Sequence, residues 1–166
     1  MSLLALPGSV RPGSTNLRWL RALQQLSASP LHIAAEVSEL PLFRAGLSAD
    51  ASVQQWREQV ANADAVIICT PEYLHNLPAM VKNALEWLTT GGELRHKPVL
   101  AMTATPAAPR GDRAMQSLLW TLDALEARVV AQLPIYDVPS LLDDAGEITD
   151  ADTKEMMQAA LAMLTG

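Results

Sequence analysis

The stretch LPGSVRPGSTNLRWLRAL, residues 6–23, joins a short apolar run to an amphipathic helical pattern. A simple turn between a strand and a helix needs only one glycine or asparagine, but this turn also carries hydroxyl groups, an amide and an arginine. Gly8 and Gly13 allow close backbone approach and unusual dihedral angles. The start of the helix adds free N–H groups and the positive end of its dipole. Together these features predict a phosphate-binding turn.

The side chains of this turn indicate which class of phosphate-binding site it is. Ser9, Ser14, Thr15 and Asn16 are neutral donors, and Arg11 has a planar guanidinium that can hold two phosphate oxygens at once. The absence of Gly-Lys-Ser/Thr and G-x-G-x-x-G excludes a triphosphate P-loop and a dinucleotide fingerprint. The turn contains no cysteine, which excludes the phosphate-binding loop of a phosphatase that uses a cysteine thiolate. The alternative is that Ser14 or Thr15 only caps the helix, but the cluster favours a phosphate that is bound and not cleaved.

Length, charge and cysteine content limit the functional classes. A chain of 166 residues fits one domain with a sizeable core. Its net charge of -6 argues against nucleic acid as a partner. The single cysteine, Cys69, excludes an intramolecular disulfide framework or thiolate metal cluster and favours a reducing, cytoplasmic compartment. No apolar run approaches the roughly 18 residues of a membrane span, so we expect no membrane partner.

Short apolar runs alternate with helical patterns along the chain. Strands are predicted at residues 3–6, 31–37, 65–69, 99–102 and 129–133, and the last three runs suggest strands covered on both faces. Helices are predicted around residues 19–26, 51–63, 78–89, 112–126 and 150–164. The last helix is predicted to bury Met156, Ala159, Ala160 and Met163. This alternation predicts a three-layer α/β fold with a parallel sheet and helices on both faces.

Ligands of such sheets bind beyond the carboxyl ends of the strands. The loop after the third strand, TPEYLHN at residues 70–76, offers the ring of Tyr73 together with the polar groups of His75 and Asn76. These groups suit a flat heteroaromatic ligand with carbonyls and ring nitrogens at its edge. The alternatives are a half-buried aromatic residue at a strand end for Tyr73 and an ordinary surface residue for His75.

Three segments resemble one family. GSVRPGSTN (8–16) followed by ADAVIICTPEYLHNLPAMVKNALEWL (63–88) resembles the NADPH-dependent FMN reductase family, which includes quinone, azo and chromate reductases. The segment ELPLFRAGL (39–47) is similar to the exit of that family's second strand. The resemblance implies a flavodoxin-like fold, with a five-stranded parallel sheet in the order 2-1-3-4-5 and FMN bound between strands one and three.

The resemblance also implies which residues bind FMN. The phosphate would be held by Ser9, Arg11, Ser14 and Asn16, with Thr15 among them as a further donor. The loop beside the isoalloxazine would be formed by Pro71, Glu72 and Tyr73, followed by Leu74, His75 and Asn76 where the family usually has Asn, then Gly or His, and Ser. The turn from Thr103 to Gly111 would flank the other edge of the ring, with Arg110-Gly111 where the family favours Gly-Gly.

The family's activity supplies the expected function. Hydride would pass from NADPH or NADH through flavin N5 to a quinone, flavin or similar small acceptor, without a catalytic side chain or a metal. Arg110 and Arg113 are candidates for a 2′-phosphate or are solvated charges. The family implies homodimers or homotetramers, with Trp87 and Trp120 at an interface or in the core. A non-enzymatic FMN electron carrier and a scaffold with weak or no FMN binding are the competing hypotheses.

Overall fold

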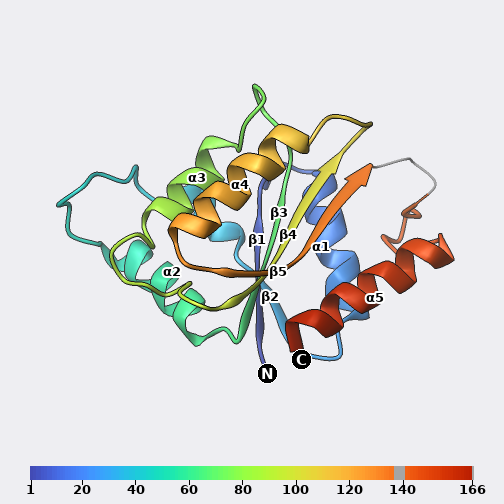
Figure 1. Cartoon of the computed structure of the whole chain (residues 1–166), viewed down its shortest axis with the longest axis horizontal. Helices are drawn as coiled ribbons and strands as arrows, with labels where there is room; N and C mark the ends of the chain where they lie inside the picture. The colour runs from blue at the N-terminus through green and yellow to red at the C-terminus, as the bar shows by residue number, and fades with distance from the viewer. Residues whose placement is uncertain (137–140, 166) are drawn as a thin grey trace.

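The computed structural model describes residues 1–136 and 141–165 of the chain. Within these residues, five parallel strands form one sheet in the order β2-β1-β3-β4-β5 (Figure 1). The strands are β1 (Leu3–Pro7), β2 (Leu31–Ile33), β3 (Ala65–Thr70), β4 (Pro98–Thr105) and β5 (Arg128–Tyr136). The predicted fold class and strand order are therefore confirmed.

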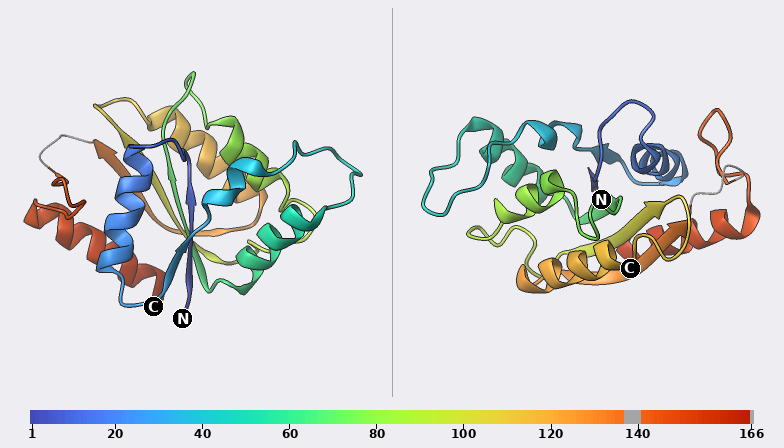
Figure 2. Two further views of the ribbon diagram at one scale, coloured as in Figure 1. Left: turned by 180° about the vertical axis from the view of Figure 1, so that it is seen from behind. Right: turned by 90° about the horizontal axis from the view of Figure 1, so that it is seen from above.

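Helices cover both faces of this sheet. They are α1 (Thr15–Leu26), α2 (Ala51–Asn62), α3 (Ala79–Glu86), α4 (Asp112–Ala124) and α5 (Ala151–Thr165). Figures 1 and 2 show α1 and α5 together on one side, and α2, α3 and α4 on the other. No helix in the described part of the chain is both long and apolar enough to cross a membrane.

The central strands supply two hydrophobic cores at once. In β1, Leu4 and Leu6 pack on the side of α2, α3 and α4, whereas Leu3 and Ala5 pack on the side of α1 and α5. Successive side chains of a strand point to opposite faces, so a strand between two helical layers must be apolar at every position. All residues of β1 and β3 are buried, which explains their continuous apolar runs.

The second strand is shorter than predicted. Only Leu31–Ile33 pairs with β1, and the rest of the predicted strand 31–37 enters a 3-10 helix, Ala35–Glu39. The N–H of Ala34 still donates a hydrogen bond to β1, but Val37 is buried in the core beside α2 and α3. The 3-10 helix, and not a longer strand, is therefore what places Val37 in the core.

The fifth strand is not covered on both faces as predicted. Arg128–Tyr136 is mostly exposed or partly exposed, and only Ile135 is fully buried. The reason is its position, because β5 is an edge strand that pairs with β4 alone. An apolar run identifies a strand, but it does not distinguish the centre of a sheet from its edge.

Two helices also end earlier than predicted. Helix α3 ends at Glu86, because the N–H groups of Leu88 and Thr89 bond to carbonyls three residues back and form tight turns. Helix α4 ends at Ala124, and Glu126 follows with a φ of +55°. A left-handed residue cannot continue a right-handed helix.

The buried stripe of α5 differs from the predicted one. The residues that face the core are Met157, Ala160, Leu161 and Leu164, whereas Met156 and Met163 are 40% and 52% exposed. Ala159 is exposed as well, so only Ala160 was predicted correctly. Both sets of residues have the same i, i+3, i+4, i+7 spacing, and they differ by a rotation of about 100° around the helix axis.

Three loops meet at the carboxyl edge of the sheet, the upper edge in Figure 1. They follow β1, β3 and β4, which are neighbours in the sheet. The strand order reverses beside β1. The loop after β1 therefore leads to α1 on one face of the sheet, the loop after β3 leads to α3 on the other face, and the two loops move apart. This is the place where open α/β sheets bind ligands.

Candidate functional site

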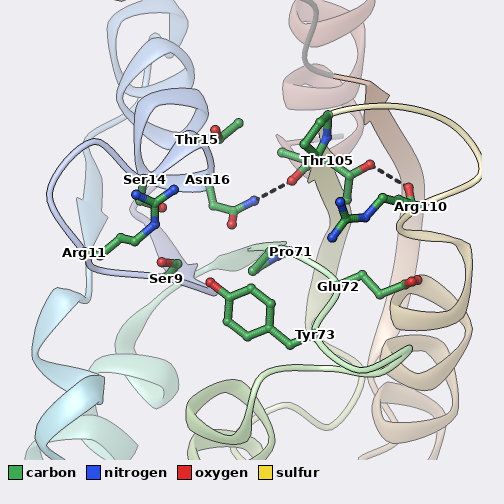
Figure 3. A pocket seen from close by; sticks show the side chains of 12 residues that line it. Ser9, Arg11, Ser14, Thr15, Asn16, Pro71, Glu72, Tyr73, Thr105 and Arg110 are labelled. Carbon is green, nitrogen blue, oxygen red and sulfur yellow. Dashed lines mark hydrogen bonds between the residues drawn. The ribbon is translucent and has the colours of Figure 1, made fainter.

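A cavity of about 200 Å³ lies between the three loops at the carboxyl edge (Figure 3). Its walls come from the start of α1, the end of β3 and the loop between β4 and α4. The lining residues are Ser9, Arg11, Ser14, Thr15, Asn16, Pro71, Glu72, Tyr73, Ala104, Thr105, Pro106 and Arg110.

The turn before α1 is closed by a backbone hydrogen bond and ends in a side-chain cap of the helix. Ser14 is buried, and its Oγ accepts a hydrogen bond from the N–H of Leu17 at 3.4 Å, so the capping role considered for it is present. The N–H of Ser14 donates to the carbonyl of Arg11 at 3.0 Å, which closes the turn. Gly13 has a φ of +72°, as such a turn requires.

Gly8 is required for a different reason, which is contact with β3. Its N–H donates to the carbonyl of Cys69 at 2.7 Å. A Cβ at this position would lie 2.5 Å from Cα of Thr70 and 2.6 Å from Cδ of Pro71. The missing side chain therefore lets the first two loops of the site lie against each other.

Asn16 holds α1 against the central strands. Its Nδ2 donates to the carbonyl of Ala104 at 3.2 Å and to Sγ of Cys69 at 3.7 Å. Burial raises the pKa of Cys69 to about 12, although the hydrogen bond from Asn16 acts in the opposite direction. The thiol is therefore protonated at neutral pH and supplies no nucleophile to the cavity.

Ser9 and Arg11 have donor groups that no other residue in the described part of the chain uses. Ser9 is 8% exposed, and its hydroxyl has no hydrogen-bond partner among residues 1–136 and 141–165. Arg11 is exposed, and its guanidinium forms no ion pair within the same ranges. Both residues stand beside the N-terminus of α1 (Figure 3). A hydroxyl, a guanidinium and a helix start make an anion site.

The loop after β3 folds into a tight turn of its own. Tyr73 and Asn76 exchange backbone hydrogen bonds of 3.0 and 2.9 Å, while Leu74 and His75 between them have φ values of +51° and +62°. Two consecutive left-handed residues are typical of a type I′ turn. The Oδ1 of Asn76 accepts from the N–H of Leu77 at 2.8 Å. Asn76 thus shapes the loop from outside the cavity.

Because of this turn, only some of the residues that the resemblance assigned to the loop line the cavity. Pro71, Glu72 and Tyr73 line the cavity, and the ring of Tyr73 is 49% exposed. Leu74, His75 and Asn76 do not line it, and Leu74 is 99% exposed. The turn therefore presents a flat aromatic ring to the cavity and turns the following residues toward solvent.

Glu72 links the second loop to α4. Its Oε2 accepts hydrogen bonds from the N–H groups of Gly111, Arg113 and Ala114, at 3.0, 3.1 and 3.3 Å. Its Oε1 lies 3.3 Å from Nδ1 of His75. Burial raises the pKa of Glu72, but these hydrogen bonds together hold it below the ordinary value for glutamate. The carboxylate is ionised at neutral pH and caps α4.

The third loop is fixed by its own hydrogen bonds. The Oγ1 of Thr105 donates to the carbonyl of Arg110 at 2.5 Å, and the N–H of Arg110 donates to the carbonyl of Ala107 at 3.0 Å. Gly111 has a φ of +106°, and a Cβ there would lie 2.9 Å from Oγ1 of Thr103. Thr103 and Gly111 pack against each other and do not line the cavity.

Four lining residues lie within the segment 103–111 that the resemblance assigned to the other edge of the ring, namely Ala104, Thr105, Pro106 and Arg110. Within that segment only the end residues Thr103 and Gly111 were singled out as binding residues, and neither lines the cavity. Strand β4 also runs further than predicted, to Thr105, whereas the apolar pattern suggested an end at 102. A proline-rich loop that follows a strand and precedes a helix with a glycine start was the available signal.

The site has the chemistry of a binding site for a phosphate ester that carries a flat ring. Arg11 and Ser9 supply the anion contacts, and Tyr73 and Pro71 supply flat apolar surface. No group of three or more His, Cys, Asp or Glu residues that could hold a metal ion occurs in the described part of the chain. These residues fit FMN, because they provide for its phosphate and for its ring separately.

Known proteins are similar to this chain in sequence and in fold. A quinone reductase of Escherichia coli K12 is 32% identical over 172 residues, covering 97% of this chain and 92% of that protein. An NAD(P)H-dependent FMN reductase of Pseudomonas aeruginosa is 28% identical over 172 residues, covering 99% and 93%. The solved structure of a flavoenzyme NAD(P)H:(acceptor) oxidoreductase from Paracoccus denitrificans superposes with a TM-score of 0.84, at 24% identity, and covers 99% of this chain and 95% of that one.

The family assignment rests on most of the chain. Residues 1–136, which include every residue that lines the cavity, match the model of the NADPH-dependent FMN reductase family. The matched region contains the turn before α1 and both other loops of the site. This chain belongs to the NADPH-dependent FMN reductase family.

Proposed function

We propose that this protein is an FMN-dependent oxidoreductase that reduces a quinone or a similar small acceptor with NAD(P)H. In the overall reaction, NAD(P)H, a proton and a quinone give NAD(P)⁺ and a hydroquinone. The observation that carries this proposal is the cavity at the carboxyl edge, where Arg11 and the Ser9 hydroxyl, both without a partner among the described residues, face the same space as Tyr73. Family membership and the named activities of the relatives support it.

The phosphate of FMN is assigned to the first turn. Ser9 and Arg11 offer side-chain contacts, whereas Ser14 caps α1 and Asn16 bonds to β4, so these two also hold the turn in shape. Thr15 lies at the start of α1 on the cavity wall. The negative phosphate is favoured at α1 over α4, because Glu72 already places a carboxylate at the N-terminus of α4.

The ring of FMN is assigned to the second and third loops. Pro71, Glu72 and Tyr73 form one wall, and Ala104, Thr105, Pro106 and Arg110, within the segment 103–111, form the other. The exposed face of the Tyr73 ring offers stacking area. Five residues act on the ring indirectly by holding these loops in shape, namely Leu74, His75, Asn76, Thr103 and Gly111.

The reaction needs no acid or base from this chain. Bound FMN supplies the hydride-accepting and electron-donating chemistry. Glu72 is held ionised by its hydrogen bonds and is a poor proton donor at neutral pH. The cavity is open to solvent at Arg11 and Tyr73, which are exposed, so water can deliver the proton that the acceptor takes up. The role of the side chains is to bind and orient.

Flavin titration and turnover test this function directly. Protein freed of flavin should quench FMN fluorescence saturably, and the loaded protein should oxidise NADPH in the presence of a quinone. If FMN binds but NADPH is not oxidised, the protein is an electron carrier. If FMN does not bind saturably, the flavin-free scaffold is the correct description and the proposed activity is wrong.

We also propose that the protein assembles as a homodimer or homotetramer in the cytoplasm. Trp120 on α4 is 68% exposed and borders a groove between α3 and α4 that Leu85 and Leu125 also line. A large exposed aromatic residue beside an apolar groove is typical of a protein interface. Trp87, the other tryptophan considered for an interface, is buried and bonds through Nε1 to the carbonyl of Pro41.

A further inference from the structure

Two guanidinium groups line the same small cavity from different walls. Arg11 belongs to the turn before α1, and Arg110 belongs to the loop before α4. Figure 3 shows them on opposite sides, with Pro71 and Tyr73 between them. Arg113 also lies near the start of α4 but is not a lining residue.

Neither guanidinium forms an ion pair with a residue of the described ranges 1–136 and 141–165. In the described part of the chain, the ion pairs are His32–Glu36, Arg57–Glu93, His75–Glu72, Lys82–Glu86 and Arg95–Glu126. Glu72 is the carboxylate on the cavity wall, but its oxygens are directed to His75 and to the N-terminus of α4. The cavity therefore presents two positive side chains that have no acidic partner among the residues that the structure describes.

Three hydrogen bonds hold the backbone around Arg110 in place. Its N–H bonds to the carbonyl of Ala107, its carbonyl accepts from Thr105, and the N–H of the next residue, Gly111, bonds to Glu72. The loop holds the backbone of Arg110 firmly while its exposed side chain remains available for a ligand.

One phosphate monoester does not require both arginines. The first turn already combines Arg11, the Ser9 hydroxyl and the N-terminus of α1 for that group. Arg110 is on a different loop, is exposed to solvent, and so meets a molecule that enters the cavity from outside. The net charge of -6 repels anions in general, which makes this local positive charge the attractive feature for an anionic substrate.

We infer that Arg110 is a specificity-determining residue, which selects electron acceptors that carry an acidic substituent such as a carboxylate or a sulfonate. This inference rests on the proposed function. A guanidinium matches the two oxygens of such a group with its planar fork. The acceptor class is therefore acidic quinones and related acidic aromatic compounds, in preference to their neutral parents.

The test compares naphthoquinone with naphthoquinone sulfonate as acceptors. The FMN-loaded protein is reduced photochemically without air, which removes the nicotinamide from the measurement, and its reoxidation by each quinone is followed at several concentrations. The two quinones differ in intrinsic reactivity. The quantity compared between variants is therefore the rate constant for naphthoquinone sulfonate divided by the rate constant for naphthoquinone. Arg110→Ala should lower this ratio about fivefold, the effect of one exposed ion pair.

Three controls separate the charge of Arg110 from general damage. Arg113→Ala removes the same charge three residues away without altering the cavity lining, and it should leave the ratio unchanged. Arg110→Lys keeps a positive charge and should restore part of the preference. Raising the salt concentration should lower the ratio for the wild-type protein and have little effect on Arg110→Ala, because ions screen an exposed charge.

The outcomes are distinguishable. If the reduced protein transfers electrons to neither quinone, the proposed function is wrong and the inference falls with it. If both quinones are reduced but the ratio is the same in wild type and Arg110→Ala, the proposed function stands and the inference is overturned. An equal fall of the ratio in Arg113→Ala also overturns it, because net charge and not Arg110 would then set the preference.

Discussion

The carboxylate of Glu72, at the end of β3, accepts a hydrogen bond from the N–H of Gly111, at the start of α4, at 3.0 Å. The two residues are 39 positions apart in the sequence. Through this bond, one wall of the cavity is attached to the other, and the N-terminus of α4 is filled by an internal anion. Of these two helix N-termini, that of α1 therefore remains open to an anion.

Removing the charge of Glu72 should destabilise the protein. Glu72→Ala leaves three backbone N–H groups without their acceptor, and we expect a loss of about 2 kcal/mol in the free energy of unfolding at neutral pH. Urea denaturation measures it. Glu86→Gln, which removes an exposed ion pair with Lys82, is the control and should change stability by less than about 0.5 kcal/mol. Equal effects of both substitutions would contradict the capping role.

The contribution of Glu72 should also depend on pH in a defined direction. Its pKa is lowered in the folded protein, so its stabilising effect is fully present above the unfolded value and is lost as the pH falls through the folded value. The difference in stability between wild type and Glu72→Gln should therefore shrink on acidification below about pH 4. A difference that grows on acidification would mean that the folded carboxyl has a raised pKa.

Arg11 should discriminate between FMN and riboflavin. Only FMN carries a phosphate. Arg11→Ala should therefore raise the dissociation constant of FMN at least about tenfold and that of riboflavin less than about twofold, as measured by fluorescence titration. Arg21→Ala removes an exposed arginine of α1 that does not line the cavity and is the matched control. Equal losses for both flavins would remove the phosphate from this turn.

The two glycines of the first turn should respond differently to alanine. At Gly8 a Cβ would collide with Thr70 and Pro71, so Gly8→Ala should cost about 3 kcal/mol and weaken FMN binding. Gly13 has open space around it but a left-handed φ, so Gly13→Ala should cost only about 1 kcal/mol. Thermal unfolding and flavin titration of both variants check the order, and a reversed order would refute the close approach of the two loops.

The exposed Trp120 should control assembly. Light scattering of the wild type should give a dimer or tetramer, and Trp120→Glu should give a monomer, because a charge would be buried without a partner at the interface. Met163→Glu changes an exposed apolar residue of α5, on the other face of the sheet, and should leave the assembly intact. A monomeric wild type would end the proposal.

Cys69 should be unreactive in the folded protein. It is fully buried and its pKa is raised to about 12, so a disulfide reagent at pH 8 should label it only on unfolding. Labelling in urea should give one thiol for each chain, which confirms that the reagent is competent. Rapid labelling of the native protein would show that β3 opens at its carboxyl end.

The turn before α1 and the alternation of strands and helices could be predicted because their signals are local. Gly8, Arg11 and Ser14 lie within a few positions of each other, and a turn of this length brings them together whatever the rest of the chain does. The order of the strands followed only once the motifs resembled a known family. The roles of the individual residues toward FMN remain predictions.

The bond between Glu72 and α4 could not be predicted, because its donors are backbone N–H groups and every residue except proline has one. The sequence shows an acidic residue beside an aromatic one, and nothing in it names a partner 39 positions away. The rotation of α5 was missed for a similar reason. Its apolar residues allow two stripes of equal spacing, and only packing against the sheet selects the one with Met157 and Leu161.

The sequence by itself determined the class of fold and the first turn of the site, because periodicity and turn chemistry act over a few residues. The tertiary structure alone decided which helix start remains open to an anion, since that depends on where the carboxylate of Glu72 ends up. It also decided that Arg110 lines the cavity whereas Arg113 does not. Both decisions depend on loops that are distant in the chain and adjacent in space, where burial and hydrogen bonding set the position of each side chain.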